Sequence, residues 1–165
     1  MSNLQFENVL DNKLIEMVEE LAKEIWSEHY TEIIGEAQVK YMVDKFQSQS
    51  AINQQIQQGL IYYLIKYKDN YIGYFAVEIK NKELFLSKLY IKAEYQNQGL
   101  GKQSFDFIEE LAKEKKLMLI SLNVNKNNIN SIKAYKKYGF IIVNEIIQDI
   151  GNNFVMDDYA MQKII

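Results

Sequence analysis

Apolar residues recur every three or four positions in the first part of the chain, at Leu14, Met17, Leu21 and Ile25. This spacing places them on one face of a helix, which we expect over residues 13–28. Asp11 or Asn12 stands just before this segment and supplies an N-cap. Gly35 interrupts the helical pattern, and two shorter helices are expected after it, at 36–47 and 50–58.

The pattern changes after Gly59 to β-branched and aromatic runs. Turn residues at Asp69-Asn70 and Asn81-Lys82 divide these runs, which predicts an antiparallel meander with strands at 60–65, 71–77 and 84–91. Helical and extended patterns then alternate to the end of the chain. We expect helices at 100–115 and 128–138, the second ended by Gly139, and strands at 118–124, 140–150 and 154–165.

The composition is that of a chain with one substantial hydrophobic core. Of 165 residues, 48% are hydrophobic and 25% are charged, and the absence of Pro leaves no obvious linker. We therefore expect a single domain over residues 1–165. No apolar run approaches the roughly 20 residues of a membrane helix, and the N-terminus lacks the pattern of a secretory signal. A cytoplasmic protein without a membrane partner is expected.

The absence of Cys excludes thiolate zinc sites and cysteine nucleophiles, and a single His excludes a histidine-rich metal site. We expect no metal.

The net charge of -3 is unevenly distributed. Residues 1–50 carry ten acids and four lysines, a net charge of -6, whereas residues 84–140 carry ten lysines and five acids, a net charge of +5. The absence of Arg and the scattered acids argue against a nucleic-acid partner. The two surfaces are either ordinary solvated faces, or they hold a polyanion on the basic side and a cation on the acidic side.

The segment Gln96–Lys102 carries the most chemical information, because it lies between a predicted apolar strand and a predicted helix. Gly99 and Gly101 allow a phosphate group to approach backbone N–H groups at the start of that helix. By themselves the two glycines would be better explained by a tight turn, but their place between a strand and a helix favours a phosphate site. The segment matches neither a P-loop nor a dinucleotide-binding loop.

The segment resembles motif A of the GCN5-related N-acetyltransferases (the GNAT family), Gln/Arg-x-x-Gly-x-Gly/Ala, through Gln96, Gly99 and Gly101. A second block is also similar to the family, and it comprises Leu122-x-Val124, Asn128, Ile132-x-Ala134-Tyr135 and Lys137-x-Gly139-Phe140. The resemblance implies an α/β fold of the GNAT acyl-CoA acyltransferase type. Its sheet is mixed, mostly antiparallel and twisted, with about seven strands and helices on both faces. The chain looks most like small bacterial members that include polyamine acetyltransferases.

The resemblance also implies acetyl-CoA as cosubstrate and a role for each matched position. Backbone groups of Leu89, Tyr90 and Ile91 would pair with the pantetheine arm. The pyrophosphate would lie on the segment that begins at Gln96, against Gln98, Gly99, Leu100, Gly101 and Lys102. Asn128 either contacts the cofactor arm or simply caps its helix. Tyr135 either protonates the departing thiolate or is an ordinary core tyrosine.

The general base is not identified by the resemblance. Many family members carry a glutamate in the strand before the phosphate loop, but residues 84–91 contain Ser87 and Lys88 and no acid. His29 is our first choice because its side chain titrates near neutrality. The remaining candidates are Glu28, Glu32 and Glu78, and for each of the four an ordinary solvated surface residue is the better explanation from sequence.

The function expected from this resemblance is acetyl transfer to a primary amine of a small, cationic acceptor by direct attack in a ternary complex. The absence of Cys agrees with direct transfer. A peptide or protein N-acetyltransferase is the alternative within the enzyme class. A non-catalytic CoA-binding regulatory module is the alternative outside it. We expect a monomer or a homodimer.

Overall fold

The computed structural model describes residues 3–165, which form helices and strands over most of their length. The helices are α1 (Asn12–Ile34), α2 (Glu36–Phe46), α3 (Gln49–Gln57), α4 (Leu100–Glu114), α5 (Ile129–Lys137) and the short 3₁₀ helix η1 (Ala93–Tyr95). The strands are β1 (Leu4–Asn8), β2 (Ile61–Tyr67), β3 (Asn70–Lys80), β4 (Glu83–Ile91), β5 (Leu119–Asn125), β6 (Ile141–Gly151) and β7 (Phe154–Ile164). Every element predicted from the hydrophobic pattern is therefore present.

Two features differ from the sequence expectation. Helix α1 does not end near residue 28 but continues to Ile34, and the chain leaves it at Gly35 with a φ of 87°, which favours glycine. Strand β1 was not predicted, because its five residues are too few for a clear alternating pattern. Its position is set by pairing with β2 instead.

The chain divides into two compact units. The first, called the N-terminal unit here, comprises residues 3–78 and Lys88–Ser104. The second, the C-terminal unit, comprises Ile79–Ser87 and Phe105–Ile165. Strand β4 and helix α4 each contribute residues to both units, so a single domain over the whole chain stays a prediction.

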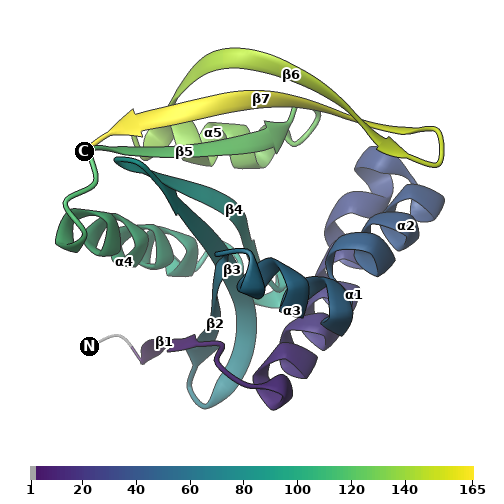
Figure 1. Cartoon of the computed structure of the whole chain (residues 1–165), viewed down its shortest axis with the longest axis horizontal. Coiled ribbons are helices and arrows are strands. Elements are labelled where there is room, and N and C mark those ends of the chain that lie inside the picture. The colour runs from purple at the N-terminus through teal and green to yellow at the C-terminus, as the bar shows by residue number, and fades with distance from the viewer. Residues whose placement is uncertain (1–2) are drawn as a thin grey trace. The chain divides into compact units, whose positions relative to one another are not determined.

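Helices α1, α2 and α3 pack against one another in the N-terminal unit (Figure 1). Strands β1, β2 and β3 pair in antiparallel order beside them. The N-cap of α1 is Asp11, whose side chain accepts a hydrogen bond from the backbone N–H of Leu14. The apolar face of α1 is buried through Ile15, Val18, Leu21, Ala22, Ile25 and Trp26. This face confirms the helical periodicity read from the sequence.

Strand β4 joins the antiparallel meander to a parallel pair. Its first residues, Glu83–Leu86, pair in parallel with Leu119–Leu122 of β5. Beyond its end, the N–H of Lys92 donates to the carbonyl of Ile72 in β3. The strand order of the sheet is β1-β2-β3-β4-β5-β7-β6. The predicted α/β fold with a mixed, mostly antiparallel sheet of seven strands is confirmed.

Gly73 allows β3 and β4 to approach closely within the N-terminal unit. A Cβ atom built at this position would lie 3.0 Å from Cα of Ile91 and still closer to the carbonyl oxygen of Tyr90. Both are backbone atoms that cannot rotate away, so any side chain here would force the strands apart. The sequence requires glycine at this point for the strands to meet.

Strands β6 and β7 form a long hairpin in the C-terminal unit (Figure 1). Its tight turn contains Asn152 and Asn153, both with positive φ, as hairpin turns of this kind require.

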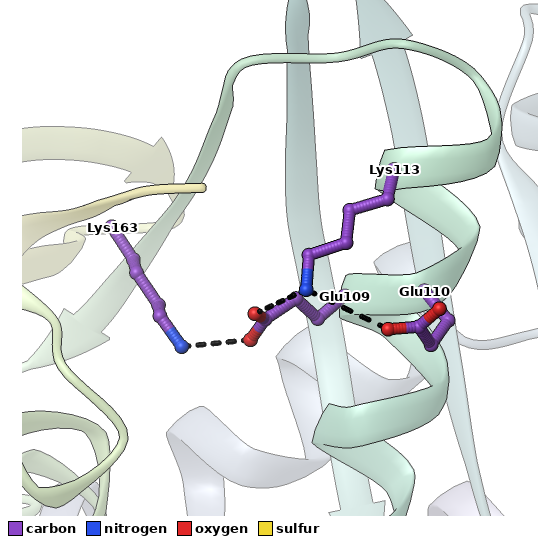
Figure 2. A network of polar contacts seen from close by, with 4 residues as sticks. All are labelled: Glu109, Glu110, Lys113 and Lys163. Carbon is purple, nitrogen blue, oxygen red and sulfur yellow. Dashed lines mark hydrogen bonds and ion pairs between the residues drawn. The ribbon is translucent and has the colours of Figure 1, made fainter.

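In the same unit Glu109 of α4 lies between two lysines (Figure 2). Its carboxylate is 2.7 Å from Nζ of Lys163 and 3.2 Å from Nζ of Lys113.

This ion-pair network lowers the pKa of Glu109, chiefly through the hydrogen bond from Lys163. Its stabilisation is therefore present above the ordinary pKa of a glutamate and is lost as the pH falls through the lowered value. Because the side chains are partly exposed, screening by solvent keeps the contribution of these pairs small. The network attaches α4 to β7 within this unit.

Candidate functional site

The loop between β4 and α4 is held by side chains of its own sequence. Nε2 of Gln96 donates to the carbonyl of Ile91, at a distance of 2.9 Å, and thereby ties the loop to the last residue of β4. Nε2 of Gln98 donates to the carbonyl of Glu94 in η1. Gln96, expected as part of a phosphate-binding motif, thus has a direct role in shaping the loop.

Two positions in this loop have left-handed backbone conformations. The φ angles are 62° at Asn97 and 77° at Gly99, and helix α4 begins at Leu100. Alternation of left-handed and right-handed residues makes successive N–H groups converge into an anion-binding concavity, which here leads into a helix N-terminus. A Cβ built at Gly99 would meet no atom within 4 Å, so the space beside it is open. The side chain of Lys102 is exposed in the first turn of α4.

The backbone at the end of β4 has one edge turned toward β3. The carbonyl of Tyr90 faces Gly73, and the N–H of Lys92 bonds to Ile72. Because polar groups of successive residues in a strand point to opposite edges, those of Leu89 and Ile91 point away from β3. Of the three residues expected to meet the pantetheine arm, Leu89 and Ile91 thus present their polar groups on the outer edge.

Asn128 and Tyr135 belong to the C-terminal unit. Asn128 is buried at the start of α5, but its side chain makes no capping hydrogen bond, so the explanation of a simple side-chain cap does not hold. Tyr135 is partly exposed, and its ring lies 5.7 Å from that of Phe105 and 6.0 Å from that of Phe140. Aromatic packing therefore holds the ring in place.

The proposed bases differ in their surroundings. His29 of α1 packs edge-on against Tyr30, and burial lowers the pKa of its imidazole. A lowered pKa keeps His29 neutral at pH 7 and therefore able to accept a proton. Glu28 and Glu32 are exposed on the same helix, whereas Glu78 of β3 is partly buried.

The sequence reading missed the environment of Lys88. Its Nζ donates to Oε1 of Gln55 at 2.8 Å and to the hydroxyl oxygen of Tyr62 at 2.7 Å. The Tyr62 hydroxyl in turn donates to the same Gln55 oxygen. Burial lowers the pKa of Lys88 to about 7. The only signal in the sequence was a lysine within the mainly apolar strand β4.

An acidic stripe runs along α1, and its members are Glu20, Glu24, Glu28 and Glu32. All four are exposed and stand four residues apart, so they share one side of the helix. Glu24 pairs with Lys92 at 3.2 Å. Like charges at this spacing destabilise a helix slightly, and their combined field attracts cations.

Within residues 3–165, no group of three or more His, Asp or Glu side chains is arranged to hold a metal ion. No helix in this same part of the chain combines the length and the apolar character needed to cross a membrane.

Residues 13–140 match the acetyltransferase (GNAT) family, which is most of the chain. The fold and the loop at the start of α4 thus define an N-acetyltransferase, and the chain belongs to the GNAT family. The predicted family and enzyme class are confirmed.

Particular relatives extend the comparison. The chain is 26% identical over 148 residues to spermidine N(1)-acetyltransferase of Thermoplasma acidophilum, covering 87% of this chain and 89% of the relative. It is 35% identical over 79 residues to a putative [ribosomal protein bS18]-alanine N-acetyltransferase of Bacillus subtilis, covering 47% of this chain and 52% of the relative. The crystal structure of the PaiA N-acetyltransferase of Thermoplasma acidophilum in complex with coenzyme A shares the fold, with a TM-score of 0.81, 22% identity and full coverage of both chains.

We expect Gly99→Val to weaken binding of CoA at least tenfold, or about 1.4 kcal/mol. The new side chain would fill the open space beside the loop and disfavour its positive φ. Gly59→Val is the matched control, because Gly59 also has a positive φ and open space but lies outside the loop. Calorimetric titration of both folded variants with CoA is the measurement. Equal affinities in the two variants would remove the loop from the binding site.

Proposed function

We propose that this protein transfers the acetyl group of acetyl-CoA to a primary amine of a small, cationic acceptor. The observation that carries the proposal is the loop from Gln96 to Lys102, with its left-handed turn leading into the N-terminus of α4. Backbone N–H groups there suit the diphosphate of CoA, and the Lys102 ammonium adds a positive charge. The outer edge of β4, with the polar groups of Leu89 and the N–H of Ile91, suits the amide groups of the pantetheine arm.

The acceptor class is inferred from charge and from similarity. The acidic stripe of α1 favours a cation over an anion near the N-terminal unit. Similarity to a spermidine N(1)-acetyltransferase over most of both chains supports a polyamine as that cation. The second candidate, a peptide α-amine, is supported by similarity to a ribosomal-protein alanine acetyltransferase over about half of each chain.

The proposed chemistry is direct attack of the amine on the thioester carbon. The C–N bond forms as the C–S bond breaks, and the electron pair of that bond goes to sulfur. We assign to the Tyr135 hydroxyl the protonation of the departing thiolate. A phenol has an ordinary pKa of about 10 and is protonated at neutral pH, so it needs no shift to act as an acid. A module that only bound CoA would have no use for such a donor.

The acceptor is tested by measuring free thiol released from acetyl-CoA with spermidine, a peptide bearing a free α-amine, and glutamate. Spermidine should be the best acceptor, and its apparent affinity should fall as salt rises to physiological strength, where charges beyond about 8 Å are screened. The double variant Glu28→Gln/Glu32→Gln should raise KM for spermidine. Glu114→Gln, which neutralises an exposed acid of α4, is the control. A better rate with the peptide would select the second candidate, and CoA binding without thiol release would select a non-catalytic module.

Tyr135→Phe should lower kcat by about 10²- to 10⁴-fold at saturating acetyl-CoA, because it removes one proton donor and leaves the ring packing in place. CoA affinity should barely change. Tyr138→Phe is the matched control, since Tyr138 also packs its ring against Phe105, at 4.9 Å. Steady-state and single-turnover kinetics distinguish chemistry from product release. An unchanged single-turnover rate in Tyr135→Phe would return this residue to a purely structural role.

A further inference from the structure

Lys88 occupies a position in the N-terminal unit that the family motifs do not explain. It directly precedes Leu89, the first residue of the β4 edge proposed to meet the pantetheine arm. Side chains two residues apart in a strand share a face, so Lys88 lies on the same face of β4 as Tyr90. The Tyr90 ring contacts Trp26 and Tyr30 of α1, at 5.4 and 5.9 Å between ring centroids. Lys88 therefore lies on the side of the sheet that carries α1.

The two hydrogen bonds of Lys88 can be donated by the neutral amine, although Nζ also lies 5.1 Å from the centroid of the Tyr62 ring, a contact that favours the ammonium ion. An ammonium group has three N–H donors, and here only two acceptors, Gln55 Oε1 and the Tyr62 hydroxyl, contact it within the described chain. A neutral amine has two N–H groups and one lone pair. Both N–H groups are then satisfied, and the lone pair is left to accept a proton.

No charged group compensates the burial of this nitrogen. No carboxylate of residues 3–165 forms an ion pair with Lys88, and burial is the cause of its lowered pKa. On the adjoining strands, burial raises the pKa values of Tyr62 in β2 and Tyr74 in β3, and both stay neutral at pH 7. These strands also carry Tyr63, Lys66, Tyr67, Tyr71, Glu78 and Lys80, of which Glu78 is a partly buried acid. None of these groups is a cause of the lowered pKa of Lys88. Gln55 of α3 is uncharged. The residue as a whole is nevertheless partly exposed.

We propose that Lys88 is the general base that removes a proton from the acceptor amine before acetyl transfer. The inference rests on the proposed function. A primary amine arrives mainly as an ammonium ion, because its ordinary pKa is about 10. One proton passes from this nitrogen to Nζ of Lys88, and the freed lone pair forms the C–N bond. The second proton lost by the nitrogen ends on the sulfur, and Lys88 returns its proton to solvent.

A base whose pKa lies near the working pH is well matched to this task. The need for a pKa near the working pH also explains why this buried lysine has no carboxylate partner. An aspartate or glutamate beside Nζ would stabilise the ammonium form and raise the pKa, which would leave Lys88 unable to accept a proton. Tyr62 is a positioning residue, since its uncharged hydroxyl accepts a hydrogen bond from Nζ and thereby holds it in place.

The test is the pH dependence of kcat/KM with spermidine for the parent protein, Lys88→Met and Lys88→Arg. In the parent, kcat/KM should rise as the pH passes through about 7 and Lys88 loses its proton. Both variants should lose about 10²- to 10⁴-fold at pH 7. Their deficit should shrink toward pH 10, where the amine loses its proton unaided. Lys66→Met of β2 is the control and should retain the parent profile.

Tyr62→Phe provides a separate test of positioning. It removes an acceptor that favours the ammonium form, so the rise in kcat/KM should move to lower pH. Unfolding measurements provide a readout independent of turnover. Because unfolded Lys88 holds its proton until about pH 10, parent stability should rise with pH above 7 relative to Lys88→Met.

The possible failures are distinguishable. The role of Lys88 alone would be overturned if Lys88→Met kept the kcat/KM and the pH profile of the parent. Full activity in Lys88→Arg would also overturn it, because arginine keeps the charge but cannot accept a proton. Absence of thiol release by the parent protein with every amine would overturn the proposed function, and the role of Lys88 with it. CoA affinity measured in each variant shows whether it is folded and competent to bind.

Discussion

The close approach of β3 to the end of β4 at Gly73 is the constraint on which the proposed site depends. It turns the carbonyl of Tyr90 toward β3 and, by strand alternation, leaves the polar groups of Leu89 and Ile91 on the opposite edge. Gln96 then ties the following loop to the Ile91 carbonyl, so that the loop proposed to bind the diphosphate starts at a fixed point. One glycine and one glutamine thus align the strand edge with the start of α4.

A buried polar network makes the same unit chemically unusual. Trp26 donates to the Tyr74 hydroxyl, which donates to Gln47, and Lys88 shares Gln55 with Tyr62. Buried polar groups are tolerated when each is hydrogen-bonded, but an ammonium ion among phenols and amides is costly unless it gives up its proton. The cost is the physical origin of a lysine that titrates near neutrality, and proton transfer from an amine is the task that such a lysine suits.

The sequence predicted what depends on local pattern and missed what depends on tertiary contacts. Periodicity located the α-helices α1 to α5 and six of the strands but not the short 3₁₀ helix η1, whereas β1 is specified mainly by its pairing with β2. The motif predicted that Gly99 lies in a loop that only glycine suits, and its positive φ agrees with that prediction. The environment of Lys88 was not predictable, because Gln55, Tyr62 and Lys88 lie on three elements that only the folded chain brings together. For the same reason the motif identified Gln96 without revealing its bond to Ile91.

The central claim is that the outer edge of β4 and the loop before α4 bind acetyl-CoA through their backbone. Amide hydrogen exchange with and without acetyl-CoA tests it most directly, because it reports each backbone N–H separately. The account predicts slower exchange at Leu89 and Ile91 and at the residues from Gln98 to Lys102 when acetyl-CoA is bound, with little change at Tyr90, whose polar groups face β3. Unchanged exchange at all of these amides under saturating acetyl-CoA would contradict it.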